Sequence, residues 1–171
     1  MVDLLADFAS RGGVMHEKEP RGFQKYKCHM CKQVVVQADV KAHKRQCKVD
    51  LIRSGPDLRA FIEHSEVFYD YSTLHVTAPS HLADILRGMS HKAVAAKVVD
   101  TKVETYRLNF PEESFKVILA FELGGLDKPL VHLITQLARE AHQDPELFLD
   151  EFAVTLATYN GDAVVSGLRQ G

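Results

Sequence analysis

Every cysteine of this chain lies in one short stretch, and the spacing there constrains the fold more tightly than any other feature of the sequence. Cys28 and Cys31 are separated by two residues, His43 follows after eleven more, and Cys47 after a further three. A tight turn brings two such sulfurs to one point, and on a helix His43 and Cys47 share a face one turn apart. Three thiolates and one imidazole make a complete tetrahedral ligand set, as in structural zinc sites.

Two other interpretations of the cysteines stay open at this point. Free cysteines inside cells are often small buried hydrophobic residues, and a disulfide between Cys28 and Cys31 is conceivable. The disulfide would leave one cysteine over and would not explain His43 at helical distance from Cys47. The pattern therefore favours Zn²⁺ as a structural cofactor, with all four positions filled by protein.

The segment 26–48 resembles the ββα zinc finger of the Cys-Cys-His-His type, in the variant that ends in cysteine. Besides the four ligands, Tyr26, Val35 and Val40 match the small apolar core of that family. The resemblance implies a hairpin, a short helix and one zinc ion. The gap of eleven residues between the ligand pairs is shorter than the usual gap of about twelve. No other part of the chain resembles a family that we can name.

Positive charge is concentrated in this same segment. Residues 20–48 carry eight basic side chains against Asp39 alone, whereas residues 49–171 have eleven basic and eighteen acidic ones. Such a surface binds phosphate with little sequence preference, and seven of its members are the candidate nucleic-acid-binding residues. These are Lys25, Lys27, Lys32, Lys41, Lys44, Arg45 and Lys48. The alternative is a solvated face, or one that docks on the acidic remainder.

Base-specific reading of a duplex is poorly supported. The positions that read bases in related fingers fall near Val36, Asp39 and Ala42, and none can make a bidentate base contact. A fingertip shifted by one residue would offer Gln37 alone.

Composition and motifs exclude several classes of protein. With 46% apolar and 26% charged residues the chain is typical of a soluble globular protein, and no apolar run reaches the ~18 residues of a membrane span. Asp3 and Asp7 argue against an export signal, so we expect an intracellular, reducing compartment. No glycine-rich phosphate loop, serine elbow or zinc-protease motif occurs. Four histidines (His64, His75, His81 and His91) lack a carboxylate at a diagnostic spacing, so we expect no catalytic residue and no enzyme.

Apolar periodicity outlines the remaining elements. Residues 1–10 are predicted to form a short amphipathic helix that ends at Gly12-Gly13. After a break at 54–56, residues 57–63 show a helical face, 66–77 a strand, and 79–89 a helix capped by Ser80.

The second half of the chain is read in the same way. Residues 93–99 are ambiguous, and 103–110 alternate as a strand. Residues 115–121 are expected to pair with that strand across 111–114, although a helix is the alternative. Two helices follow, at 128–142 and from 144 to the Asn160-Gly161 pair.

The sequence thus predicts an α+β protein in three parts: an N-terminal amphipathic segment (1–19), a zinc finger (20–50) and an α+β domain ending in two helices (51–171). The first functional hypothesis is a non-catalytic protein whose finger contacts nucleic acid phosphates while the C-terminal domain contacts protein, as a partner or homo-oligomer. The second is a protein-binding adaptor or structural subunit of a larger, viral or other, assembly, with zinc as a staple and no nucleic acid.

Overall fold

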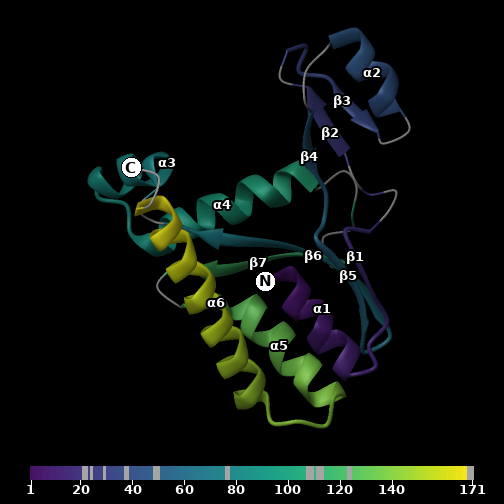
Figure 1. The fold of residues 1–171 in the computed structure, drawn as a ribbon, viewed down its shortest axis with the longest axis vertical. Coiled ribbons are helices and arrows are strands. Elements are labelled where there is room, and N and C mark those ends of the chain that lie inside the picture. The colour runs from purple at the N-terminus through teal and green to yellow at the C-terminus, as the bar shows by residue number, and fades with distance from the viewer. Residues whose placement is uncertain are drawn as a thin grey trace.

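The computed structural model describes residues 1–20, 23, 25–28, 30–36, 39–47, 51–75, 78–106, 110, 114–122 and 125–168 (Figure 1). Its larger sheet has the strand order β1-β5-β6-β7 and its smaller sheet the order β3-β2-β4. The strands are β1 (His16–Lys18), β2 (Lys25–Cys28), β3 (Val34–Val36), β4 (Leu51–Ser54), β5 (Leu58–Ile62), β6 (Ser65–Leu74) and β7 (Phe115–Phe121). The helices are α1 (Val2–Arg11), α2 (Val40–Cys47), α3 (Pro79–Leu86), α4 (His91–Tyr106), α5 (Lys128–Glu140) and α6 (Pro145–Leu168). The α+β class is confirmed.

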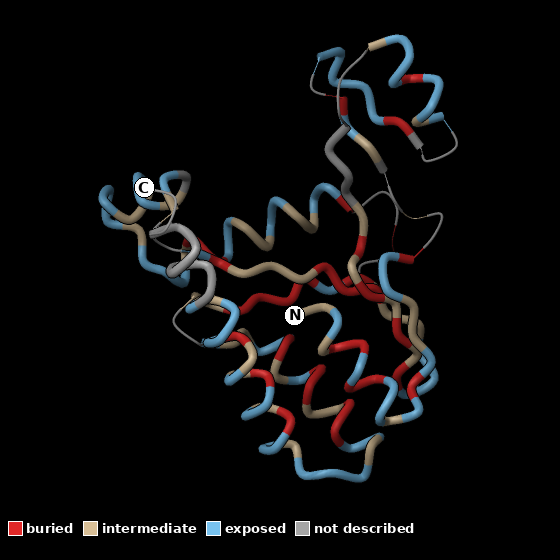
Figure 2. Tube along the Cα trace, viewed as in Figure 1, coloured by how far each residue is buried: buried red, intermediate tan, exposed pale blue. Residues whose placement is uncertain are grey.

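One face of the larger sheet is covered by α1, α5 and α6 (Figures 1 and 2). Phe8 of α1 packs on Phe148 of α6 with ring centroids 4.4 Å apart, and Phe152 meets Tyr71 of β6 edge to face. The apolar stripe of α5 is fully buried between them, as its spacing predicts. The larger sheet and the helices packed on it are called the body below. The short N-terminal helix packs on this body, which supplies the burial that an isolated helix of this length lacks.

The opposite face of the sheet is covered by α4, with α3 beside it. Phe68 of β6, Phe115 of β7 and the rings of Tyr106 and Phe110 form an aromatic cluster there. Phe23, in the segment that leads to the smaller sheet, stacks on the same cluster with centroids 4.7 Å from Phe68 and 5.4 Å from Phe110. This contact anchors the base of the metal-binding region to the body.

The helix predicted for residues 57–63 is wrong, because these residues form strand β5. Leu58, Ala60 and Ile62 are buried in alternation, which is the period of a half-buried strand. Glu63 and His64 join β5 to β6 as a two-residue turn with positive φ of 50° and 66°. Turns of that shape usually carry Asn-Gly or Asp-Gly, so the sequence lacks the ordinary hairpin signal.

The strand predicted for 103–110 is also wrong, because α4 continues through Tyr106. Residues 107–109 and 111–113 lie outside the described residues. Strand β7 is confirmed, but its partner is β6, in parallel pairing from Phe68↔Phe115 to Leu74↔Phe121. Parallel strands need a long crossover, and α3 with α4 provides it; the ambiguous residues 93–99 lie within this crossover.

Two predicted helix ends need correction. Ala78 is the N-cap of α3, and Pro79 takes its first turn, so Ser80 lies inside the helix. On α3, Leu82 and Leu86 are 41% and 78% exposed, while Ile85 packs against the apolar cluster on this face of the sheet. Helix α6 passes through Asn160-Gly161 and continues to Leu168, and the Asn160 side chain donates to the Glu122 carbonyl at 2.9 Å.

Candidate metal centre and carboxylate cluster

Two backbone hydrogen bonds shape the turn that carries the first two cysteines. Lys32 N donates to Cys28 O at 3.0 Å, and Cys28 N donates to Gln33 O at 2.9 Å. Lys32 takes a positive φ of 61°, which lets the chain reverse between β2 and β3. Cys28 ends β2 fully buried, whereas Cys31 in the turn is exposed. The predicted hairpin is therefore present.

Helix α2 supplies the other two candidate ligands from one face. His43 is buried and Cys47, one turn later, is half-buried. Val35 of β3 is buried beside them, while Tyr26 and Val40 are half-buried. One feature departs from the hairpin-plus-helix expectation: β4 adds a third strand on the other side of β2, in register from Lys25↔Ser54 to Cys28↔Leu51.

The four side chains converge as the spacing predicts. The ligand atoms of Cys28, Cys31, His43 and Cys47 all lie within 4.8 Å of one another, and Cys31 Sγ is 3.5 Å from His43 Nε2. A tetrahedron with metal–sulfur bonds of about 2.3 Å has edges of roughly 3.8 Å, so this group matches a metal centre in size. The three cysteines are free of disulfides, which removes the disulfide alternative.

The thiols differ in their proton affinity. Hydrogen bonding from the Cys31 backbone amide, with His43 adding to it, lowers the pKa of Cys28 to about 6. Burial, with the neighbouring thiols Cys31 and Cys28, raises the pKa of Cys47 to about 11. Three thiolates at this separation repel one another, and a divalent cation at their centre relieves that repulsion.

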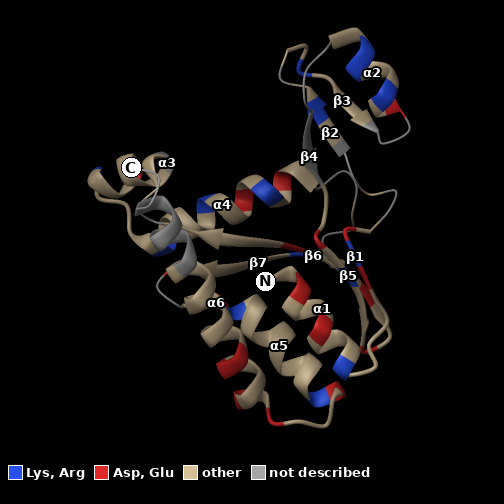
Figure 3. Cartoon of the chain, in the orientation of Figure 1, with Lys and Arg blue, Asp and Glu red and all other residues tan. Residues whose placement is uncertain are grey.

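The basic residues predicted to contact nucleic acid surround this centre. Lys41, Lys44 and Arg45 are exposed on α2, away from the ligand face, and Lys27 and Lys32 are exposed on β2 and in the turn. Lys25 lies two residues before Lys27 on β2, and Lys48 lies outside the described residues. Figure 3 shows basic residues on β2 and α2, with acidic residues on α1 and α6. Asp39 and Ala42 are exposed; the side chain of Val36 and all of Gln37 lie outside the described part.

A second polar cluster, missed in the sequence, lies at the base of the small sheet. Asp57 precedes β5, and the register Leu58↔Tyr69 places it opposite Asp70 of β6. Asp70 is only 4% exposed, and Lys102 of α4 donates to its carboxylate. Asp57 accepts from Tyr71 N at 2.8 Å. Like charges directly opposite on adjacent strands are destabilising, so this pair is unfavourable unless a cation compensates it.

The pKa shifts around Asp57 and Asp70 also indicate that negative charge is unfavourable here. Burial raises the pKa of Asp70 to about 6, and Asp57 adds to the effect, while Lys102 opposes it. Burial, with Asp70 and Asp57 beside it, also raises the pKa of the Tyr106 hydroxyl, whereas a Gly55 amide lowers it. Lys102 and Tyr106 are four residues apart on α4 and so lie on one helical face. The carboxylate cluster (Asp57, Asp70, Lys102 and Tyr106) thus joins three elements beside β4.

Correct secondary structure would have revealed this cluster. Had 57–63 been read as a strand, a two-residue turn at 63–64 would have set Asp57 against Asp70. A helix predicted through residue 106 would have placed Lys102 and Tyr106 on one face. The four histidines considered above belong to no metal-binding group in the described chain; His75 pairs with Glu122 at 3.1 Å.

Comparisons with protein-family models, with curated proteins and with solved structures gave no match. What the geometry establishes is a Cys-Cys-His-Cys group beside a small hairpin and a helix, as in zinc-binding motifs. Within the described residues, no helix has both the length and the apolar character needed to cross a membrane.

Proposed function

We propose that this chain binds Zn²⁺ at Cys28, Cys31, His43 and Cys47 and contacts nucleic acid through its phosphates with the surrounding basic side chains. The observation that carries the proposal is the division of α2 into two faces. His43 and Cys47 face the metal centre, whereas Lys41 and Arg45 are exposed. A zinc-stapled helix holds such side chains in a fixed array, which suits a regularly spaced polyanion.

Phosphate contact rather than base reading is favoured by the residues available. Asp39 and Ala42 stand where related fingers read base edges, and an exposed carboxylate there repels phosphate rather than specifying a base. The finger therefore supplies affinity with little sequence preference.

Salt dependence of binding tests this proposal. With the full chain and a fluorescent duplex, we expect log K to fall linearly with log salt. In Lys41→Glu/Arg45→Glu the slope should be shallower by about two, because two phosphate contacts are lost. The matched control, Lys92→Glu/Arg139→Glu, reverses two exposed charges on the body and should keep the wild-type slope. No binding at low salt would instead favour the adaptor hypothesis, in which the finger is only a stapled protein interface.

The carboxylate cluster supports a second candidate function, cleavage of the bound nucleic acid. Two opposed carboxylates are oxygen ligands of the kind that Mg²⁺ binds together with substrate phosphate. Such an ion activates water and stabilises charge on a phosphoryl group. Lys102 is placed to neutralise a phosphate oxygen once a cation takes its place on Asp70. Hydrolysis would form a bond from water oxygen to phosphorus and break one P–O bond, with a proton passing to the leaving oxygen.

This second function also fits the position of the cluster. Gly55 and Pro56 alone separate β4 of the small sheet from Asp57, and the Tyr106 hydroxyl is close to the Gly55 amide. Nucleic acid held by the finger would therefore lie near the two carboxylates. No sequence motif for catalysis accompanies these carboxylates, and the absence of enzymatic activity stays a prediction.

Cleavage is tested with a labelled oligonucleotide and Mg²⁺ or Mn²⁺. We expect nicking by the wild type and its loss in Asp57→Asn and Asp70→Asn, with the salt slope of binding unchanged. Cleavage should require Mg²⁺ or Mn²⁺ even when the finger keeps its zinc. We therefore expect no nicking at a chelator concentration that removes Mg²⁺ but leaves zinc in the finger. If the wild type does not cut and gains no stability from Mg²⁺, the pair serves the fold alone, through Lys102 and the Tyr71 amide.

A further inference from the structure

One half of the outer edge of β7 is open. This strand ends the sheet order β1-β5-β6-β7. Its second half is covered by the following segment, since Asp127 N donates to Leu119 O at 3.0 Å and Phe121 N donates to Gly125 O at 2.7 Å. Backbone groups alternate in direction along a strand, so Val117 presents its N–H and C=O to the same side. Within the described chain, those two groups have no hydrogen-bond partner.

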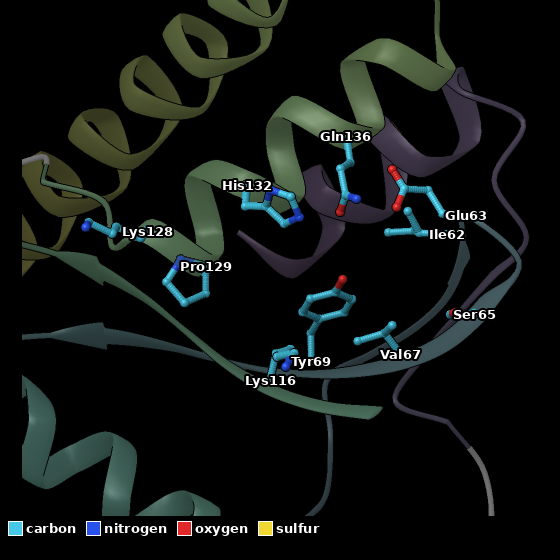
Figure 4. Close-up of a pocket in the computed structure, with 10 residues that line it drawn as sticks. All are labelled: Ile62, Glu63, Ser65, Val67, Tyr69, Lys116, Lys128, Pro129, His132 and Gln136. Atoms are coloured by element: carbon cyan, nitrogen blue, oxygen red, sulfur yellow. The ribbon is translucent and has the colours of Figure 1, made fainter. Parts of the chain in front are cut away.

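Two cavities flank the open edge, one on each face of the sheet. The first, of about 540 Å³, lies between the sheet and α5 (Figure 4). The second, of about 470 Å³, lies on the α4 side and is lined mainly by apolar groups that include Val103, Phe110 and Phe115, with Glu104 also in its lining. Lys116 and Pro129 line both cavities. An added strand would send its side chains alternately into the two.

The two cavities are lined by different kinds of side chain, and this difference indicates which ligand side chains each can accept. Lys116, Lys128 and His132 line the first cavity, and neither lysine has an ion-pair partner among the described residues. In Figure 4 the Tyr69 hydroxyl, His132 and Gln136 point toward one another across this cavity. The acidic lining residue, Glu63, lies beside Gln136 and Ile62, so the basic end of the cavity is the one that holds Lys116 and Lys128. The first cavity therefore suits an acidic side chain and the second an apolar one.

We propose that the open edge of β7, from Phe115 to Val117, binds an extended acidic peptide segment of a partner protein as an additional strand. Backbone hydrogen bonds to Val117 would align the peptide, and its alternating side chains would enter the two cavities. A second copy of this chain is a poorer fit, because a charged side chain such as Lys116 on an edge strand opposes pairing with its own kind. The inference goes beyond the proposed function, since it concerns the body and not the finger.

Amide exchange measured by NMR on the full zinc-loaded chain tests the proposal. The probe is an acetylated and amidated pentapeptide of alternating leucine and aspartate. We expect the amide of Val117 to exchange quickly in the free protein and about tenfold more slowly at saturation, because an added strand protects it. A pentapeptide of alternating leucine and lysine is the control and should have no effect. Slow exchange at Val117 in the free protein would overturn the proposal, because the edge would already be covered. Unchanged exchange with the acidic peptide would also overturn it.

Charge reversal at the edge provides the second test. Lys116→Glu changes an exposed side chain and should lower the affinity for the acidic peptide by about tenfold or more. The circular dichroism spectrum should be unaltered. Lys92→Glu, an exposed change on α4, should leave the affinity unchanged. Sedimentation of the wild type without peptide should show no dimer. A dimer that Lys116→Glu abolishes would mean that the edge of β7 binds a second copy of this chain, which would contradict the proposal.

Discussion

Among single residues, Asp70 shows most clearly how burial and a neighbour set a charge. It lies 4% exposed beside Asp57, and one lysine, Lys102, faces it from α4. With a pKa near 6 against an ordinary 3.8, the folded chain takes up this proton before the unfolded chain does. Asp70 therefore contributes stability that is full below pH 3.8 and is lost as the pH rises through 6.

This shift predicts the pH dependence of Asp70→Asn. In magnesium-free buffer, acidification from pH 7 to pH 4 should stabilise the wild type relative to this variant, by on the order of 2 kcal/mol. Urea unfolding at both pH values measures the difference. Asp84→Asn is the control with the opposite sign, because a hydrogen bond from Lys97 lowers the pKa of Asp84. An identical pH dependence in Asp70→Asn and the wild type would contradict the assignment.

Cys47 is the ligand that distinguishes this group from the Cys-Cys-His-His pattern. Cys47→His keeps four donors and removes one negative charge, so we expect it to retain one zinc ion per chain. Cys47→Ala leaves three donors and should lose the metal to a moderate chelator. Elemental analysis after gel filtration measures both. Equal zinc content in Cys47→Ala and the wild type would mean that Cys47 is not a ligand.

At the scale of single elements, capping residues determine where helices begin when their side chains are free to turn back. Asp127 accepts from Leu130 N at 2.9 Å and starts α5, followed by Lys128 and Pro129. Asp144 does the same for the Glu146 amide before α6. Asn160 caps no helix: its side chain donates to the Glu122 carbonyl, and α6 continues through it to Leu168.

The cap of α5 gives a prediction about this element. Asp127→Ala should lower the free energy of unfolding by about 1 kcal/mol. Asp127→Asn should lower it much less, because the side-chain carbonyl oxygen of Asn can accept the same hydrogen bond from Leu130 N. Thermal or urea unfolding compares the two. An equal loss in both variants would show that the charge of Asp127 matters and the cap does not.

For the whole molecule, the two sheets share no strand, and they differ in what holds them together. Around the metal centre, the buried side chains of the described residues are Cys28, Val35 and His43. A core so small depends on its metal. The body has two large apolar clusters, one on each face of its sheet.

Removal of the metal should therefore unfold one part of the molecule. With a strong chelator, we expect NMR signals of residues 25–47 to collapse toward random-coil values while those of α1, α5 and α6 keep their positions. The thermal transition of the body should shift by only a few degrees. Loss of both sets of signals together would show that the sheets unfold as one cooperative unit.

The sequence by itself determined the features that depend on short spacings. The grouping of the three cysteines with His43, the stripe of α5 and the amphipathic α1 need only local geometry, and the structure shows each of them. The α+β class followed from the mixture of helical and strand patterns, and the strand at 115–121 followed from an apolar run.

Only the tertiary structure decided the rest. Residues 57–63 and 103–110 show both helical and strand periodicity, and contacts distant in the chain selected between them: pairing with β6 for the first, and packing of α4 on the sheet for residues 103–106 of the second. The pairing of Asp57 with Asp70 depends on a turn without its usual residues, and Lys102 reaches them only through a crossover helix. Local spacing contains no information about such contacts, because they depend on which strands become neighbours.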